Sequence, residues 1–103
     1  MIAEIEVAEI EVNGQAYWVQ WSFPFNFTFC AIVSVKNGRQ TGTFGPAVCN
    51  PKDFYDRKVG MKWAARRACG IRDDRWDYSP RNPDHHAIYG QLRKVIKERY
   101  PDD

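Results

Sequence analysis

Strict alternation of apolar side chains restricts the first half of the chain to β-strands, because a period of two fits a pleated strand and not a helix. On one face, the strand that ends near Pro24 carries Tyr17, Val19, Trp21 and Phe23. Trp18 falls on the opposite face and is therefore a candidate contact residue outside the core. The same alternation continues over residues 25–35, which predicts a third strand.

Asn-Gly pairs mark the turns between these strands. The pair at 13–14 follows a first strand predicted at residues 2–12, and the pair at 37–38 leads to a fourth strand at about residues 40–49. Pro46 lacks the amide hydrogen that an inner strand needs, so we expect the end of the fourth strand to lie at a sheet edge.

The first strand changes the phase of its alternation. Ile5 and Val7 share one phase, whereas Ile10 and Val12 share the other. A residue inserted into the ladder switches the face on which later side chains lie. We therefore expect a β-bulge near residues 8–9.

Two helices are predicted after the strands. The first begins at the Asn-Pro-Lys-Asp run of residues 50–53 and ends at Gly70, and the polar segment 71–83 is predicted to be a long loop. The last helix begins near Asp84 and ends before Pro101. Its apolar face carries Ile88, Leu92, Val95 and Ile96. The 103 residues thus predict a single α+β domain, with an antiparallel sheet of about four strands in the order β-β-β-β-α-α and both helices on one face.

The first helix carries a cationic ridge between two apolar sides. Lys58, Lys62 and Arg66 are spaced i, i+4, i+8 and project from one side, where they are available to a partner or form a solvated face. Trp63 and Val59 lie beside the ridge. We expect them to be buried beneath the C-terminal helix in preference to forming an exposed docking patch.

Charge is separated along the chain although the net charge is only +2. Acidic residues concentrate in segment 4–11, and most Lys and Arg follow residue 52, which excludes a uniformly acidic DNA mimic and suits a nucleoprotein partner. The chain starts with alternating Glu and has no long apolar run. We therefore expect no secretory leader, no membrane partner and a cytoplasmic location.

Catalytic and metal-binding patterns are weak. Cys49, Cys69, His85 and His86 lack the paired spacing of structural zinc sites, and three cysteines without a C-x-x-C motif indicate reduced thiols. The Asp residues of segment 73–77 lack the glycine and terminal Glu of a Ca²⁺ loop. We expect no enzymatic activity, no metal and no cofactor.

Segment 27–69 resembles a group of small phage and prophage proteins of uncharacterised role. The shared features are a Pro-x-Asp helix start at 51–53, a basic step with glycine at 57–60 and the Ala-rich basic run at 64–68. Such small phage proteins are often inhibitors of host defence, anti-CRISPR proteins among them. The resemblance therefore implies an anti-defence role in the cytoplasm of a bacterial host cell.

The same helix also resembles the last helix of double-stranded RNA-binding domains. Arg57 and Lys58 match the Lys pair of that family, and Asp56 and Gly60 replace its Ser and first Ala. Residues 64–69 complete its Ala-Ala-basic-basic-Ala-Leu run, with Cys in the last place. In that family the Lys pair grips phosphates across the major groove. This resemblance implies direct binding of nucleic acid.

We therefore expect a non-enzymatic phage-type inhibitor that docks on a host nucleic-acid-handling protein complex. Direct nucleic-acid binding is the alternative, and self-association as a homodimer is a third. The candidate contact residues are Arg57, Lys58, Lys62, Arg66, Arg67, Trp18, Trp63 and Trp76.

Overall fold

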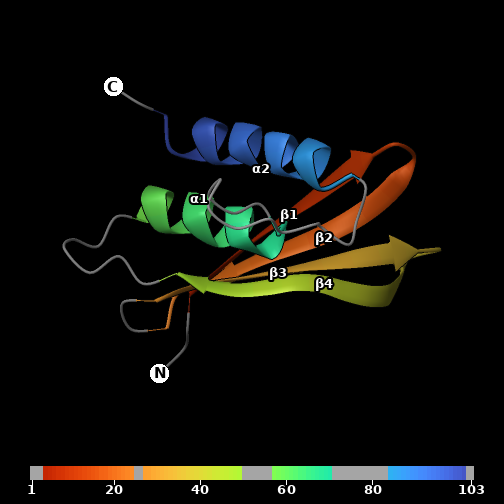
Figure 1. Cartoon of the computed structure of the whole chain (residues 1–103), viewed down its shortest axis with the longest axis horizontal. Helices are drawn as coiled ribbons and strands as arrows, with labels where there is room; N and C mark the ends of the chain where they lie inside the picture. Colours follow the sequence, from red (N-terminus) through yellow and green to blue (C-terminus); the bar gives the residue numbers. More distant parts are fainter. Residues whose placement is uncertain (1–3, 25–26, 50–56, 71–83, 102–103) are drawn as a thin grey trace.

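The computed structural model describes residues 4–24, 27–49, 57–70 and 84–101, with the backbone alone for 41–49. An antiparallel meander of four strands is followed by two helices, which confirms the predicted α+β fold (Figure 1). The elements are β1 (Ile5–Val12), β2 (Gln15–Ser22), β3 (Thr28–Lys36), β4 (Arg39–Cys49), α1 (Arg57–Ala68) and α2 (His85–Arg99). The strands pair in sequential order, so β4 lies at an edge, as Pro46 predicted.

Both Asn-Gly pairs form the hairpin turns that the sequence predicts. The φ angles are 51° and 78° at Asn13 and Gly14, and 53° and 77° at Asn37 and Gly38. Positive φ at both central residues is typical of a type I′ turn, whose twist matches that of the flanking strands. The turns therefore set the register of β1 with β2 and of β3 with β4.

The predicted bulge in β1 is wrong. The register of β1 with β2 runs without interruption from Ile5 opposite Ser22 to Val12 opposite Gln15. Ile5 is 55% exposed and Val7 half-buried, because their phase faces away from the helices and the strand never needs to switch. The register shifts lie instead between β3 and β4.

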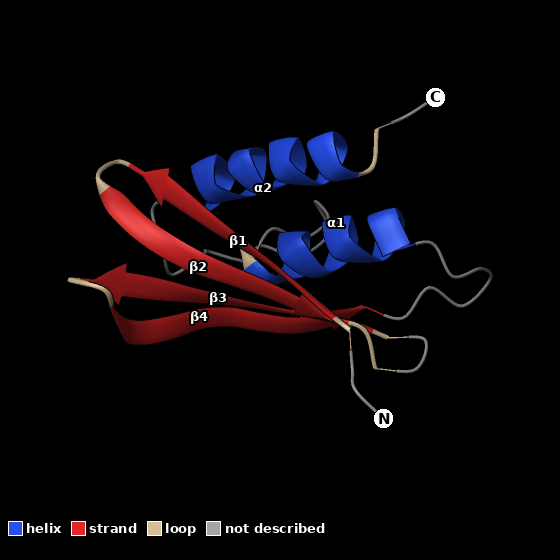
Figure 2. Cartoon of the chain, turned by 180° about the vertical axis from the view of Figure 1, so that it is seen from behind, coloured by secondary structure: helices blue, strands red, loops and turns tan. Residues whose placement is uncertain are grey.

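Both helices cover the same face of the sheet (Figure 2). α1 packs on β3 and β4, while α2 packs against α1 and over β1. The fully buried side chains between the layers include Val19, Trp21, Ile32, Met61, Ile88, Leu92 and Ile96. Neither described helix covers the opposite sheet face, where Trp18 is half-buried.

Small residues let α1 approach the sheet closely. A Cβ placed on Gly60 would overlap the Thr28 hydroxyl oxygen and lie 3.2 Å from the Thr28 Cβ. The indole Nε1 of Trp21 donates a hydrogen bond to the Met61 carbonyl oxygen at 3.2 Å. Together these contacts fix the position of α1 on β2 and β3.

The helix ends are set as predicted where the structure describes them. Gly70 has a φ of 77° and donates its amide to the Arg67 carbonyl at 2.9 Å, which ends α1. Asp84 precedes α2, and its carboxylate accepts a hydrogen bond from the Asn13 amide at 2.7 Å. The predicted helix start at 50–53 and the predicted loop at 71–83 lie outside the described residues.

Candidate functional site

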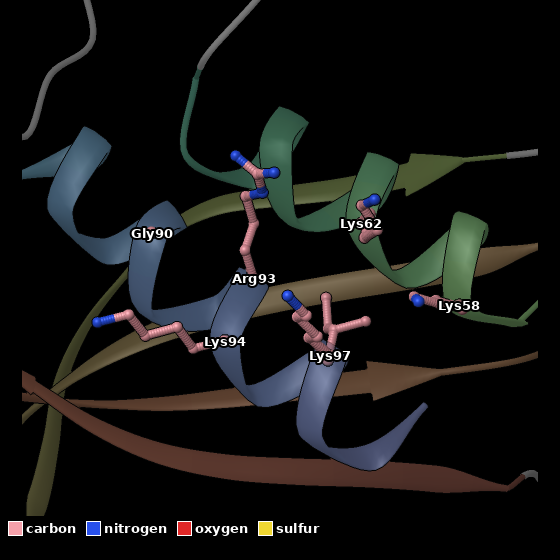
Figure 3. Close-up of a pocket in the computed structure, with 7 residues that line it drawn as sticks. Lys58, Lys62, Gly90, Arg93, Lys94 and Lys97 are labelled. Atoms are coloured by element: carbon pink, nitrogen blue, oxygen red, sulfur yellow. The ribbon is translucent and has the colours of Figure 1, made fainter. Parts of the chain in front are cut away.

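A groove runs between α1 and α2, and cations line most of it. One part is a hollow of about 370 Å³ at the end near the start of α1. Its lining residues are Lys58, Lys62, Gly90, Arg93, Lys94, Ile96 and Lys97. Figure 3 shows that Lys58 and Lys62 come from α1 and the other labelled residues from α2, with Lys94 pointing away from α1.

A second hollow of about 600 Å³ continues the first, because Lys62, Gly90 and Arg93 line both. It adds Trp63, Arg66, His86 and Tyr89 to the lining. We call the two hollows together the basic groove. Among the described residues that line it, none is acidic, so its walls are positively charged.

Helix periodicity explains why these side chains converge. On α2, His86, Gly90, Arg93 and Lys97 are spaced i, i+4, i+7 and i+11, which places them on one face. On α1, the ridge residues line the groove from the other side, as Lys62 does in both hollows. Gly90 gives the groove depth, because nothing lies within 4 Å of the position that its Cβ would take.

Two aromatic side chains lie at the His86 end of the groove. Trp63 is 42% exposed, and the Arg66 guanidinium carbon lies 5.5 Å from the centre of its ring. Tyr89 is half-buried with the Arg93 guanidinium carbon 5.9 Å from its ring centre. Both distances lie within the range of cation–π attraction.

The predicted burial of Trp63 beneath the C-terminal helix is therefore wrong. α2 lies on the side of α1 that carries Lys58 and Lys62, as both line the hollow between the helices. Trp63 points about 100° further round the helix than Lys62, so α2 does not cover it. Val59, expected beside it, is half-buried.

Arg57 lies outside the groove lining and joins the acidic strand to α1. Its guanidinium pairs with Glu4, lies 3.9 Å from a Glu6 carboxylate oxygen, and stacks 4.3 Å from the Phe23 ring centre. Arg99 at the end of α2 also pairs with Glu6, at 3.4 Å, and donates to a β1 carbonyl. Glu4, just before β1, and Glu6 within β1 thus contact the start of α1 and the end of α2.

Tyr100 completes this cluster by donating its hydroxyl to Glu6. The pKa of the Tyr100 hydroxyl is raised, mainly by burial and to a smaller extent by this hydrogen bond. Glu6 therefore binds two arginines and one tyrosine from segments more than fifty residues away. Glu6 lies on the helix-facing side of β1, and these three partners explain why an acidic residue occurs on that otherwise apolar face.

The remaining predicted contact residues lie apart from the groove. Arg67 is exposed on α1 but lines neither hollow. Trp18 lies on the sheet face away from both helices, and Trp76 lies outside the described residues. The structure thus brings together Lys58, Lys62, Arg66 and Trp63.

Among the described residues, the two buried thiols and the two adjacent histidines do not form a recognisable catalytic or metal site. Cys30 and Cys69 are free and buried. Burial raises the pKa of the Cys69 thiol to about 12, and burial together with the neighbouring Cys69 raises the pKa of Cys30 further. Thiols with such pKa values are protonated at neutral pH. The His85 and His86 rings lie 3.9 Å apart, and no three described His, Cys, Asp or Glu side chains cluster as metal ligands do.

Sequence reasoning missed the contribution of α2 to the groove. The predicted contact residues include none from α2, yet Arg93, Lys94 and Lys97 all line the hollow. The available signal was the spacing of Gly90, Arg93 and Lys97, which marks one polar helix face opposite the apolar one.

Neither described helix has the length and apolar content that crossing a membrane requires. No family model, curated protein or solved structure matches the chain. The geometry of the groove and the chemistry of its walls therefore carry the argument for function.

Proposed function

We propose that the chain is a non-enzymatic binding protein whose basic groove holds the phosphates of a nucleic acid. The observation that carries the proposal is the convergence of Lys62 from α1 with Arg93 and Lys97 from α2 around one hollow. Side-chain ammonium and guanidinium groups bind phosphate oxygens through charge-assisted hydrogen bonds. A groove with such groups on both walls follows a chain of phosphates.

A purely solvated face explains this arrangement less well. Arg93 and Lys97 are one helical turn apart, and like charges at this spacing disfavour a free helix by roughly 0.2–0.5 kcal/mol. Lys62 on the opposite wall adds to the repulsion across the groove. A bound polyanion would remove this repulsion and release the counterions that its phosphates hold.

The test is a titration of fluorescently labelled oligonucleotide, read by anisotropy at about 50 mM salt. In the groove variant, Lys62 and Arg93 are both changed to Glu. The matched control changes Lys36 and Arg39, an exposed Lys and Arg beside the β3–β4 turn that line neither hollow. We expect the groove variant to lose at least about tenfold in affinity while the control changes less than about threefold. Equal losses in both folded variants would contradict the proposal.

A second candidate function is docking on a host nucleic-acid-handling complex as an anti-defence inhibitor. The observation that favours it is the sheet face that neither described helix covers, which carries half-buried apolar side chains. These are Trp18, Phe29, Val33 and Val35. The phage-type role itself rests on the sequence resemblance of segment 27–69.

Site-specific photo-crosslinking tests this second candidate. A photoreactive phenylalanine analogue is placed at Trp18, and for control at Glu98, which is exposed on α2. In nuclease-treated bacterial lysate, position 18 should give one dominant product with a nucleic-acid-handling protein that position 98 does not give. A product with a second copy of this chain would indicate homodimerisation instead. The absence of a product specific to position 18 would refute docking through this face.

A further inference from the structure

We infer that the basic groove takes single-stranded nucleic acid and discriminates against duplex. This inference rests on the proposed function and names the substrate of the same site. The relevant observation is that the cations lie on the two walls of a concave channel, with Gly90 leaving its centre open. Positively charged channels that follow one backbone are typical of single-strand binding.

The width of the helix pair disfavours entry into a duplex. Two packed helices with axes 8–10 Å apart and diameters of 10–12 Å are together about 20 Å across. The major groove of B-DNA is about 12 Å wide and admits one helix, and that of duplex RNA is narrower still. The cations that face each other across the basic groove, such as Lys62 and Arg93, therefore lie where a duplex groove cannot receive them.

Trp63 supplies the second element of a single-strand site. Trp63 as a whole residue is 42% exposed, and it lies beside the channel at the end where Tyr89 and His86 also line the hollow. An exposed indole beside phosphate-binding cations is a platform on which an unpaired base stacks. Bases of a duplex are stacked on each other and present no free face, so this contact is available to single strands alone.

Anisotropy titrations of the full chain test the inference. The probes are labelled single-stranded DNA, single-stranded RNA and duplex DNA, each about a dozen nucleotides or base pairs long, at about 50 mM and 200 mM salt. We expect at least one single strand to bind about tenfold tighter than the duplex. The two single-strand arms distinguish DNA from RNA.

Variants identify the contacts. Trp63→Ala should weaken single-strand binding by roughly 5- to 150-fold, Trp63→Phe should restore most of it, and both should leave the salt dependence unchanged. Phe27→Ala, which removes another exposed aromatic side chain that lines neither hollow, is the matched control and should have no effect. Gly90→Gln fills the channel without a charge and should also weaken binding. Circular dichroism confirms that each variant folds.

The possible failures are distinguishable. If duplex binds as tightly as single strands, or if folded Trp63→Ala binds normally, the inference is overturned, while loss of binding in the Lys62 and Arg93 charge variants would still support the proposed function. If no nucleic acid binds at about 50 mM salt, both the inference and the proposed function are refuted.

Discussion

Replacing Gly60 with alanine tests how closely α1 lies on the sheet. The new methyl group would overlap the hydroxyl oxygen of Thr28, a side chain that is completely buried. Gly90 on α2 is the matched control, since a methyl group there meets nothing within 4 Å. Both glycines lie inside helices, so the gain in helix propensity is similar at the two sites.

The expected magnitudes follow from two opposing terms. Gly→Ala inside a helix contributes about 1 kcal/mol of stability through propensity. Overpacking in a dense core costs roughly 1–3 kcal/mol. Gly90→Ala should therefore stabilise the protein by about 1 kcal/mol, while Gly60→Ala should be neutral or destabilising by up to about 2 kcal/mol.

Urea unfolding followed by circular dichroism measures both changes. The double variant Gly60→Ala with Thr28→Ala removes the overlapping oxygen, so the cost of the new methyl group should be smaller in that background than alone. The Thr28 hydroxyl has no hydrogen-bond partner among the described residues, and its removal breaks no bond there. Stabilisation by Gly60→Ala equal to that by Gly90→Ala would refute the close packing of α1 on β3.

Two further predictions concern the strand end and the buried thiols. Glu6→Gln should destabilise the fold by about 1–2 kcal/mol in urea unfolding, because it weakens contacts with Arg57, Arg99 and Tyr100. The control Glu11→Gln on the same strand should change stability by less than about 0.5 kcal/mol. Equal effects of the two substitutions would contradict a stabilising role for the contacts of Glu6. In a Cys49→Ser background, no thiol should react rapidly with a disulfide reagent at neutral pH, and both should react in denaturant. Because the pKa of Cys69 is raised from 9.0 to about 12, its contribution to stability is complete below pH 9 and decreases as the pH rises toward 12. Rapid labelling of the native protein at neutral pH would contradict the burial of the two thiols.

Local sequence signals predicted most of the fold. The Asn-Gly turns, the alternation in β2 and β3, and Gly70 at the end of α1 depend on residues close in sequence, and the structure confirms each. The phase change in β1 was misinterpreted, because alternation alone does not say which face of a strand end is covered. Glu6 takes the helix-facing position there, held by arginines distant in sequence.

The groove was only half predictable. The spacing of Lys58, Lys62 and Arg66 gave one wall, but its other wall depends on how α2 packs across α1. The exposure of Trp63 has the same cause, since a helix approaching from the other side of α1 would have buried it. The side of α1 on which α2 packs depends on contacts between distant segments, and periodicity within one helix does not encode it.

The salt dependence of nucleic-acid binding tests the central claim most directly. The slope of log affinity against log salt is measured for the original chain, for Lys62→Gln with Arg93→Gln, and for Lys36→Gln with Arg39→Gln. If each groove residue neutralises one phosphate of a single strand, the groove variant should lose about 1.4 from the magnitude of the slope, and the turn variant should lose almost nothing. A slope unchanged by the groove substitutions, or reduced equally by both pairs, would show that the groove does not hold phosphates.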